Sequence, residues 1–161
     1  MKQVHEDYLR SALFGLQDGL VSTTGVVVGI STGVEDKAII ILAAFVAVTV
    51  EASSMGAGQY SSEKAVHQMT GKHTDNLILG AIIMFLSYLF AGMIPITPII
   101  IFEQPSARTI SIAFAFLGLF VIGYAKGKIV GHKPLRSAAE LFIIGSIATL
   151  IGLIVGQLLK V

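Results

Sequence analysis

Apolar residues dominate five stretches of the sequence, and short polar segments separate them. Each stretch reaches the roughly 20 mostly apolar residues that a membrane-spanning helix requires. The pattern therefore predicts an all-α integral membrane protein with five transmembrane helices. These helices are expected at about residues 12–31, 38–60, 77–101, 107–127 and 138–159. They use most of the chain, so residues 1–161 are predicted to form a single five-helix transmembrane domain without a soluble domain.

The composition agrees with a membrane location and excludes several kinds of site. Hydrophobic residues make up 54% of the chain and charged residues only 13%, whereas soluble domains carry about a quarter. Cysteine is absent, which excludes disulfides and thiolate metal centres and leaves methionine as the only soft metal ligand. We expect no resident cofactor, no removable signal peptide and no nucleic-acid partner. Pro95 and Pro98 are expected to kink or end the third helix.

Lysine and arginine residues predict the orientation. Five spans place the two termini on opposite sides of the membrane, and most basic residues lie in segments on the side of the N-terminus. The positive-inside rule therefore predicts a cytoplasmic N-terminus. Residues 127–136, GKIVGHKPLR, are expected to lie at the lipid headgroups. The basic residues on the N-terminal side are Lys2, Arg10, Lys64, Lys72, Lys126, Lys128, Lys133 and Arg136, and those on the other side are Lys37, Arg108 and Lys160.

Two acids lie inside the first two predicted helices. Asp18 follows Ser11 by seven residues and Glu51 precedes Ser61 by ten, so both lie roughly 10–15 Å from the same membrane surface. A carboxylate at this depth costs about 2.5–3.5 kcal/mol, and such residues usually face a bundle interior or a wet cavity. The acids could simply hydrogen-bond between helices or remain protonated. Because they share a depth and have no buried basic partner, we favour a cation or proton site.

The second helix extends this site toward the cytoplasm. Glu51, Met55, Gln59 and Glu63 are spaced four apart and therefore follow one face of the helix. Carboxylates with a thioether favour Fe²⁺ or Mn²⁺ over Mg²⁺ or Ca²⁺, and the same donors are also compatible with Co²⁺, Ni²⁺ or Zn²⁺. We predict that Met55 joins the two acids as a ligand and that Gln59 and Glu63 mark the entrance. The alternative is that Met55 only packs and that Gln59 and Glu63 are solvated.

Small residues are concentrated in the same two helices, where their four-residue spacing permits close helix packing in lipid. Packing alone explains most of these positions, although closely packed polar helices also line narrow paths. Ser22, Ser54 and Gly58 are therefore predicted to line the path. The spaced pairs are Gly15–Gly19, Gly25–Gly29, Ala52–Gly56 and Ser54–Gly58, with a further pair, Gly152–Gly156, that we interpret as packing only.

Residues 61–76 are predicted to form a short cytoplasmic loop between the second and third helices. Glu63, His67, His73 and Asp75 could capture a metal ion there, but solvated loop residues are the favoured interpretation. A role for this loop in metal capture stays open.

Two long motifs resemble one known family. LFGLQDGLVSTTGVVVGIS (13–31) and VEASSMGAGQYSSEKA (50–65) resemble the first- and second-helix signatures of the vacuolar iron transporter family, which transports iron and manganese. AGMIPITP (91–98) and PLRSAAELFIIG (134–145) are similar to further parts of that family. The resemblance covers nearly the whole chain, and it is closest to a short branch that lacks a cytoplasmic metal-binding domain.

This resemblance implies a homodimer whose ion path runs between helices one and two at the dimer interface. It implies export of Fe²⁺ or Mn²⁺ from the cytoplasm in exchange for protons, for metal homeostasis, with Asp18, Glu51 and Met55 as the family's ligands. Gln59 stands where relatives commonly carry an acid. A cell membrane is expected by default, with a vacuole-like membrane as the alternative.

Competing functions predict different behaviour. A membrane scaffold would show no metal flux and would tolerate Glu51→Gln, and an uncoupled cation channel would show flux without proton dependence. An intramembrane hydrolase is disfavoured because no His or Lys lies at the depth of the membrane Ser and Thr residues. We therefore do not expect an enzyme.

Overall fold

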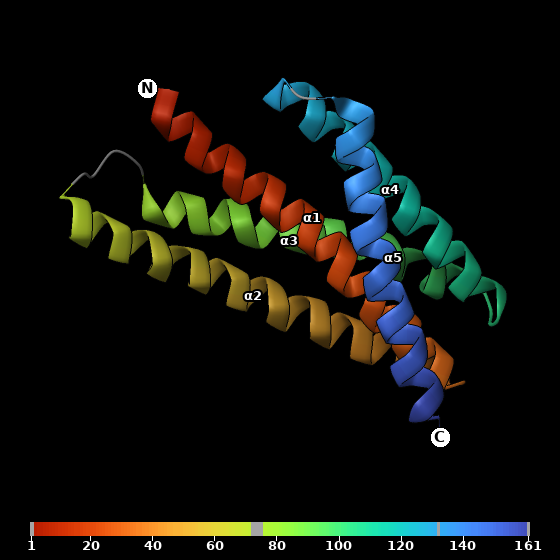
Figure 1. The fold of residues 1–161 in the computed structure, drawn as a ribbon. Helices are drawn as coiled ribbons and strands as arrows, with labels where there is room; N and C mark the ends of the chain where they lie inside the picture. Colours follow the sequence, from red (N-terminus) through yellow and green to blue (C-terminus); the bar gives the residue numbers. More distant parts are fainter. Residues whose placement is uncertain (1, 72–75, 132, 161) are drawn as a thin grey trace.

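The computed structural model describes residues 2–71, 76–131 and 133–160, and it is all-helical within those residues (Figure 1). Five helices are long and apolar enough to cross a membrane, which confirms the predicted fold class and the multi-pass membrane architecture. The helices are α1 (Lys2–Gly33), α2 (Lys37–Thr70), α3 (Leu77–Ile101), α4 (Ser106–Val130) and α5 (Pro134–Leu158).

Helix α2 continues well past the predicted span. It runs to Thr70, so residues 61–70 are helical and the expected loop over 61–76 is wrong for that part. The apolar pattern marks only the part of a helix that suits lipid, whereas caps decide where the helix ends. Asp36 accepts hydrogen bonds from the backbone N–H groups of Ala38 and Ile39, and Gly71 ends the helix at φ 66°.

Helix α3 passes through both of its prolines and ends only at Ile101. The expectation that Pro95 or Pro98 ends the helix is therefore wrong. Transmembrane helices tolerate proline where hydroxyl groups and neighbouring helices bond to nearby carbonyls. Here the Thr97 hydroxyl donates to the Met93 carbonyl at 2.7 Å, and the Ser111 hydroxyl of α4 donates to the Pro95 carbonyl at 2.5 Å.

Helix α1 lies in the middle of the bundle, and α2 lies along one edge of it (Figure 1). Helix α1 packs most extensively on α3 and α5, and α2 packs mainly on α3. The α1–α5 contact depends on small residues. A Cβ atom at Gly29 would lie 3.0 Å from the carbonyl oxygen of Gly152. A Cβ atom at Gly33 would lie 3.0 Å from the carbonyl oxygen of Gly156. The interpretation of Gly152 and Gly156 as packing residues is confirmed.

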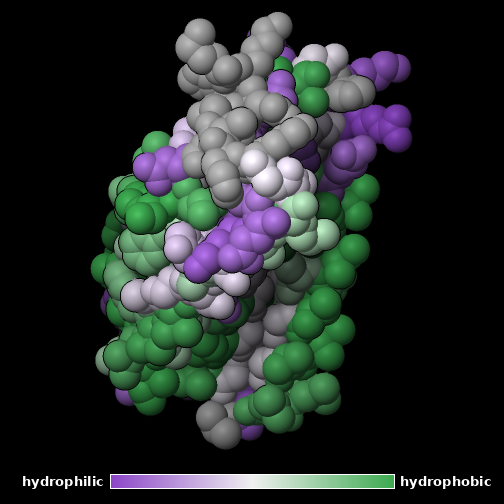
Figure 2. Space-filling model, turned by 90° about the vertical axis from the view of Figure 1, so that its left-hand side faces the viewer, coloured by the Kyte–Doolittle hydropathy of each residue, from purple (hydrophilic) through white to green (hydrophobic). Residues whose placement is uncertain are grey.

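The surface matches a protein surrounded by lipid. Figure 2 shows hydrophobic side chains over the flank of the bundle and hydrophilic ones gathered toward one end. Many large apolar side chains are exposed on the outer helices, including Leu42 at 66%, Phe90 at 67% and Leu117 at 63%. Exposed apolar area of this extent is unfavourable in water and suits a bilayer.

Candidate functional site

The two intramembrane acids approach each other between neighbouring helices. Asp18 on α1 and Glu51 on α2 are both half-buried, and the charge of Glu51 acts directly on Asp18. Within the described part of the chain, no lysine or arginine forms an ion pair with either acid. The two acids expected at a matched depth are therefore close enough to influence each other, and none of the ion pairs among the described residues includes either of them.

Glu51 is held by hydroxyl groups from two other helices. Tyr88 on α3 donates a hydrogen bond to Glu51 Oε2, and Ser22 on α1 donates to the same oxygen at 3.3 Å. The Ser22 and Tyr88 hydroxyls are also within hydrogen-bond distance of each other, and because each carries one hydrogen, only two of these three hydrogen bonds form at a time. Ser22, predicted to line the path, thus lies at the carboxylate. Tyr88 is 1% exposed and was not predicted from the sequence.

Two glycines bring α3 close enough for Tyr88 to reach the site. A Cβ atom at Gly15 would lie 2.8 Å from the Met84 carbonyl oxygen, and one at Gly19 would lie 2.9 Å from Tyr88 Cα. Only glycine permits this approach of the two backbones, as expected for small residues four apart in lipid. The spaced pair therefore contributes to the site by positioning Tyr88.

Met55 lies one turn beyond Glu51 and is partly buried. It packs against a core cluster that includes Val48, Ala52 and Tyr88. Its position on the same helical face as Glu51 agrees with the predicted stripe, and its packing agrees with the alternative interpretation as well.

A polar network joins α1 and α2 at the predicted entrance. The Gln59 side-chain amide donates to Ser11 Oγ at 2.9 Å and to Glu63 Oε1 at 3.3 Å. The Arg10 guanidinium forms an ion pair with the same Glu63 oxygen. Gln59 and Glu63 are thus brought together, and Arg10 and Ser11 are additional members that the sequence did not reveal. This network lies between Asp18 and the N-terminal end of α1.

Ser54 and Gly58, which were also predicted to line the path, do not lie at the carboxylates of this chain. Both are exposed on α2, and no neighbouring atom lies within 4 Å of a Cβ built at Gly58. In contrast, Gly56 packs against α3, where a Cβ would lie 3.1 Å from the Ala81 carbonyl oxygen. Helix α2 therefore presents one small-residue face to its own bundle and a second small-residue face outward.

His67 lies in a helix and not in a loop. His67 was expected to be a solvated loop residue, but it lies in α2 and is only 8% exposed. Helix α2 continues for more than two turns past Ser61, which places this side chain against the bundle. His73 and Asp75 lie outside the described residues.

The candidate ligands of one chain do not by themselves complete a metal centre. Among the described residues, no group of three or more His, Cys, Asp or Glu side chains could hold a metal ion. Asp18 and Glu51 supply two carboxylates and Met55 a nearby thioether. Divalent first-row ions usually take four to six ligands. Water or a second copy of the chain would have to supply the remainder.

The model of the VIT family matches residues 9–76 and 66–157. The chain belongs to the VIT family. The family resemblance of the two helix signatures is therefore confirmed, and the match includes both acids and the methionine.

Relatives of this VIT-family chain include Vacuolar iron transporter 1 of Arabidopsis thaliana, 40% identical over 65 residues that cover 40% of this chain and 26% of the relative. The Vacuolar iron transporter of Plasmodium berghei (strain Anka) is 30% identical over 99 residues, which cover 57% of this chain and 36% of the relative. Vacuolar iron transporter homolog 4 of Arabidopsis thaliana is 28% identical over 152 residues, which cover 86% of this chain and 76% of the relative. The chain spans only 26% of the length of the first relative, but most of homolog 4.

Proposed function

We propose that this protein is a transporter, not an enzyme, and that it moves Fe²⁺ or Mn²⁺ out of the cytoplasm in exchange for protons. The observation that carries the proposal is the convergence of Asp18 and Glu51 at membrane depth without a basic partner. Two unpaired carboxylates in this position favour binding of a divalent cation or of protons. The names of the relatives, vacuolar iron transporters, support a metal as cargo.

Proton exchange follows from the same pair of side chains. A metal ion binds the ionised carboxylate, so protons and metal compete for Asp18 and Glu51. Export of a divalent cation against an inside-negative potential costs roughly 4.6 kcal/mol per 100 mV. Inward movement of protons on the vacated carboxylates supplies that free energy. Met55 biases the site toward transition metals rather than Mg²⁺ or Ca²⁺.

The working unit we propose is a homodimer with cytoplasmic N-termini. The excess of basic residues at the N-terminal end supports this orientation. The outward small-residue face at Ser54 and Gly58 supports close approach of a second α2, which would add a second set of carboxylates to the incomplete centre. The cell membrane is our default location, with a vacuole-like membrane as the alternative.

Flux measurements in proteoliposomes test the proposal. We expect uptake of Fe²⁺ or Mn²⁺ that increases with an opposing pH gradient and that is abolished in Asp18→Asn and Glu51→Gln. Glu103→Gln is the matched control, because Glu103 is an exposed carboxylate away from the site and pairs with Lys37. Circular dichroism and gel filtration establish that each variant is folded.

The alternatives give different results in the same assay. Flux that Glu51→Gln leaves intact, together with its proton dependence, would contradict the mechanism. Flux that is independent of the pH gradient would indicate a cation channel. The complete absence of flux from folded protein would indicate a membrane scaffold.

A further inference from the structure

A cavity of about 410 Å³ lies at the end of the bundle that carries the N-terminus, apart from the carboxylate site. It is formed by the last turns of α4 and the first turns of α5. Gly127 holds the two helices together, because a Cβ atom there would lie 2.6 Å from Pro134 Cα. The close packing of α4 on α5 therefore fixes the walls of the cavity.

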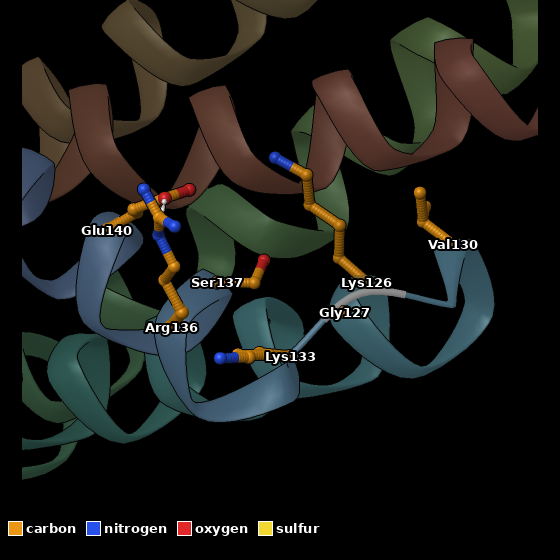
Figure 3. Close-up of a pocket in the computed structure, with 7 residues that line it drawn as sticks. All are labelled: Lys126, Gly127, Val130, Lys133, Arg136, Ser137 and Glu140. Atoms are coloured by element: carbon orange, nitrogen blue, oxygen red, sulfur yellow. Dashed lines mark ion pairs between the residues drawn. The ribbon is translucent and has the colours of Figure 1, made fainter.

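The hydroxyl of Ser137 faces this cavity. Ser137 is 9% exposed and is one of the residues that line the cavity. Figure 3 shows the hydroxyl directed into the space between Lys126 and the Arg136–Glu140 pair. A serine hydroxyl in this position is available to donate a hydrogen bond to an anion in the cavity.

The lining carries a net positive charge. Lys126, Lys133 and Arg136 surround the cavity, and Glu140 is the single acid. Arg136 lies 3.3 Å from Glu140, but both side chains are exposed, so this pair is weak. Lys133 forms no ion pair with the described residues. The N-terminus of α5 has no side-chain cap, and its dipole adds to the attraction for an anion.

The surroundings identify the kind of anion. Val130 lines the cavity and is 54% exposed, and Leu135, which precedes Arg136 on α5, is 68% exposed, as lipid-facing residues are. On α4, Lys128 lies 5.6 Å from the centre of the Tyr124 ring, and aromatic residues of this kind mark the membrane interface. A free phosphate ion would use the charges but not the apolar flank.

We propose that this cavity binds the phosphate of an anionic phospholipid. Lys126, Lys133 and Arg136 compensate its charge, the Ser137 hydroxyl donates a hydrogen bond to a phosphate oxygen, and the acyl chains lie along Val130 and Leu135. Basic pockets between transmembrane helices bind lipid headgroups in this way. The proposal does not depend on metal transport.

Native mass spectrometry of the delipidated full-length protein tests the site, with phosphatidylglycerol as probe and phosphatidylcholine as the zwitterionic comparison. We expect Lys133→Gln/Arg136→Gln to weaken phosphatidylglycerol binding at least about tenfold, and Ser137→Ala about threefold. Glu140→Gln should strengthen it, because a competing carboxylate is removed. The matched control is Lys64→Gln/Lys128→Gln, which removes the same charge outside the cavity.

Each other outcome overturns the proposal. Equal loss in the two double variants would show that general surface charge attracts the lipid. Equal binding of phosphatidylcholine would show that the negative charge is not recognised. Displacement of phosphatidylglycerol by inorganic phosphate, with equal affinity for phosphate alone, would make the ligand a free anion. Unchanged phosphatidylglycerol binding in Ser137→Ala and Glu140→Gln would show that the lipid does not bind in this cavity.

Discussion

The hydroxyl of Tyr88 on α3 donates a hydrogen bond to Glu51 on α2, and it does so from a helix that carries no acid of its own in the membrane. The position of the carboxylate is therefore controlled by three helices, since Ser22 on α1 bonds to the same oxygen. The two hydroxyl groups fix the orientation in which this carboxylate would meet a metal ion.

Removing this hydroxyl should weaken metal binding. In Tyr88→Phe the ring keeps its packing, but Glu51 loses a donor worth about 1.5 kcal/mol or more, so we expect the apparent KM for Fe²⁺ or Mn²⁺ to rise roughly tenfold. Tyr60→Phe is the matched control, because Tyr60 is an exposed residue on α2. An unchanged KM in proteoliposome assays would show that the Tyr88 bond has no influence on the metal.

The ion pair of Arg10 and Glu63 should couple α1 to α2. Glu63 is 13% exposed at its side chain and Arg10 is 61% exposed, so we expect a coupling energy of about 1 kcal/mol, at the upper end for surface pairs. A double-mutant cycle with Arg10→Gln and Glu63→Gln, followed by thermal denaturation in detergent, measures it. Additive effects of the two substitutions would mean that the pair does not couple the helices.

Substitution of Gly19 should destabilise the bundle. A Cβ atom at this position would overlap the backbone of Tyr88, so α1 and α3 would have to separate, at an expected cost of about 1–3 kcal/mol. Gly58→Ala is the control, because the space around Gly58 is open within the chain. The melting temperature in detergent should fall for Gly19→Ala and remain nearly unchanged for Gly58→Ala.

A bulkier residue at Gly58 tests the outward face of α2. If two copies approach through this face, Gly58→Leu should convert the dimer to a monomer while the helical content is retained. Multi-angle light scattering in detergent distinguishes the two states. A dimer that persists in Gly58→Leu would place the interface between copies on another helix.

Thr23 offers a stabilising substitution. Its side chain is 1% exposed, and its hydroxyl is buried without a hydrogen-bond partner among the described residues. Thr23→Val keeps the shape and removes an unpaired polar group, so we expect the free energy of unfolding to rise by about 1 kcal/mol. A lower stability, measured by denaturation in SDS, would reveal a partner for this hydroxyl.

The fold was predictable because a spanning helix needs a long apolar stretch, and each of the five stretches became a helix. The approach of Asp18 to Glu51 was predictable from their depth on consecutive antiparallel helices. The full length of α2 was not predicted, because the apolar pattern marks only the part of a helix that lies within the membrane. The signals for its ends, Asp36 and Gly71, were nevertheless present as capping residues.

Tyr88 could not be predicted by the same reasoning. Glycine spacing at Gly15 and Gly19 indicates a close contact with another helix but does not say which helix makes it. Only the packing of α1 on α3 places the Tyr88 hydroxyl at Glu51. A tyrosine hydroxyl within an otherwise apolar stretch was the available signal, because a polar group in a bundle core needs a partner.

The edge position of α2 places the two intramembrane acids on helices that differ in their number of neighbours. Among the described residues, α2 packs on α1 and α3 alone, as α5 packs on α1 and α4 alone, whereas α1 contacts all four other helices. Asp18 therefore lies on the helix with the most neighbours, and Glu51 lies on a helix with two. A change in the gap between the two carboxylates would disturb fewer interfaces if α2 moved than if α1 moved.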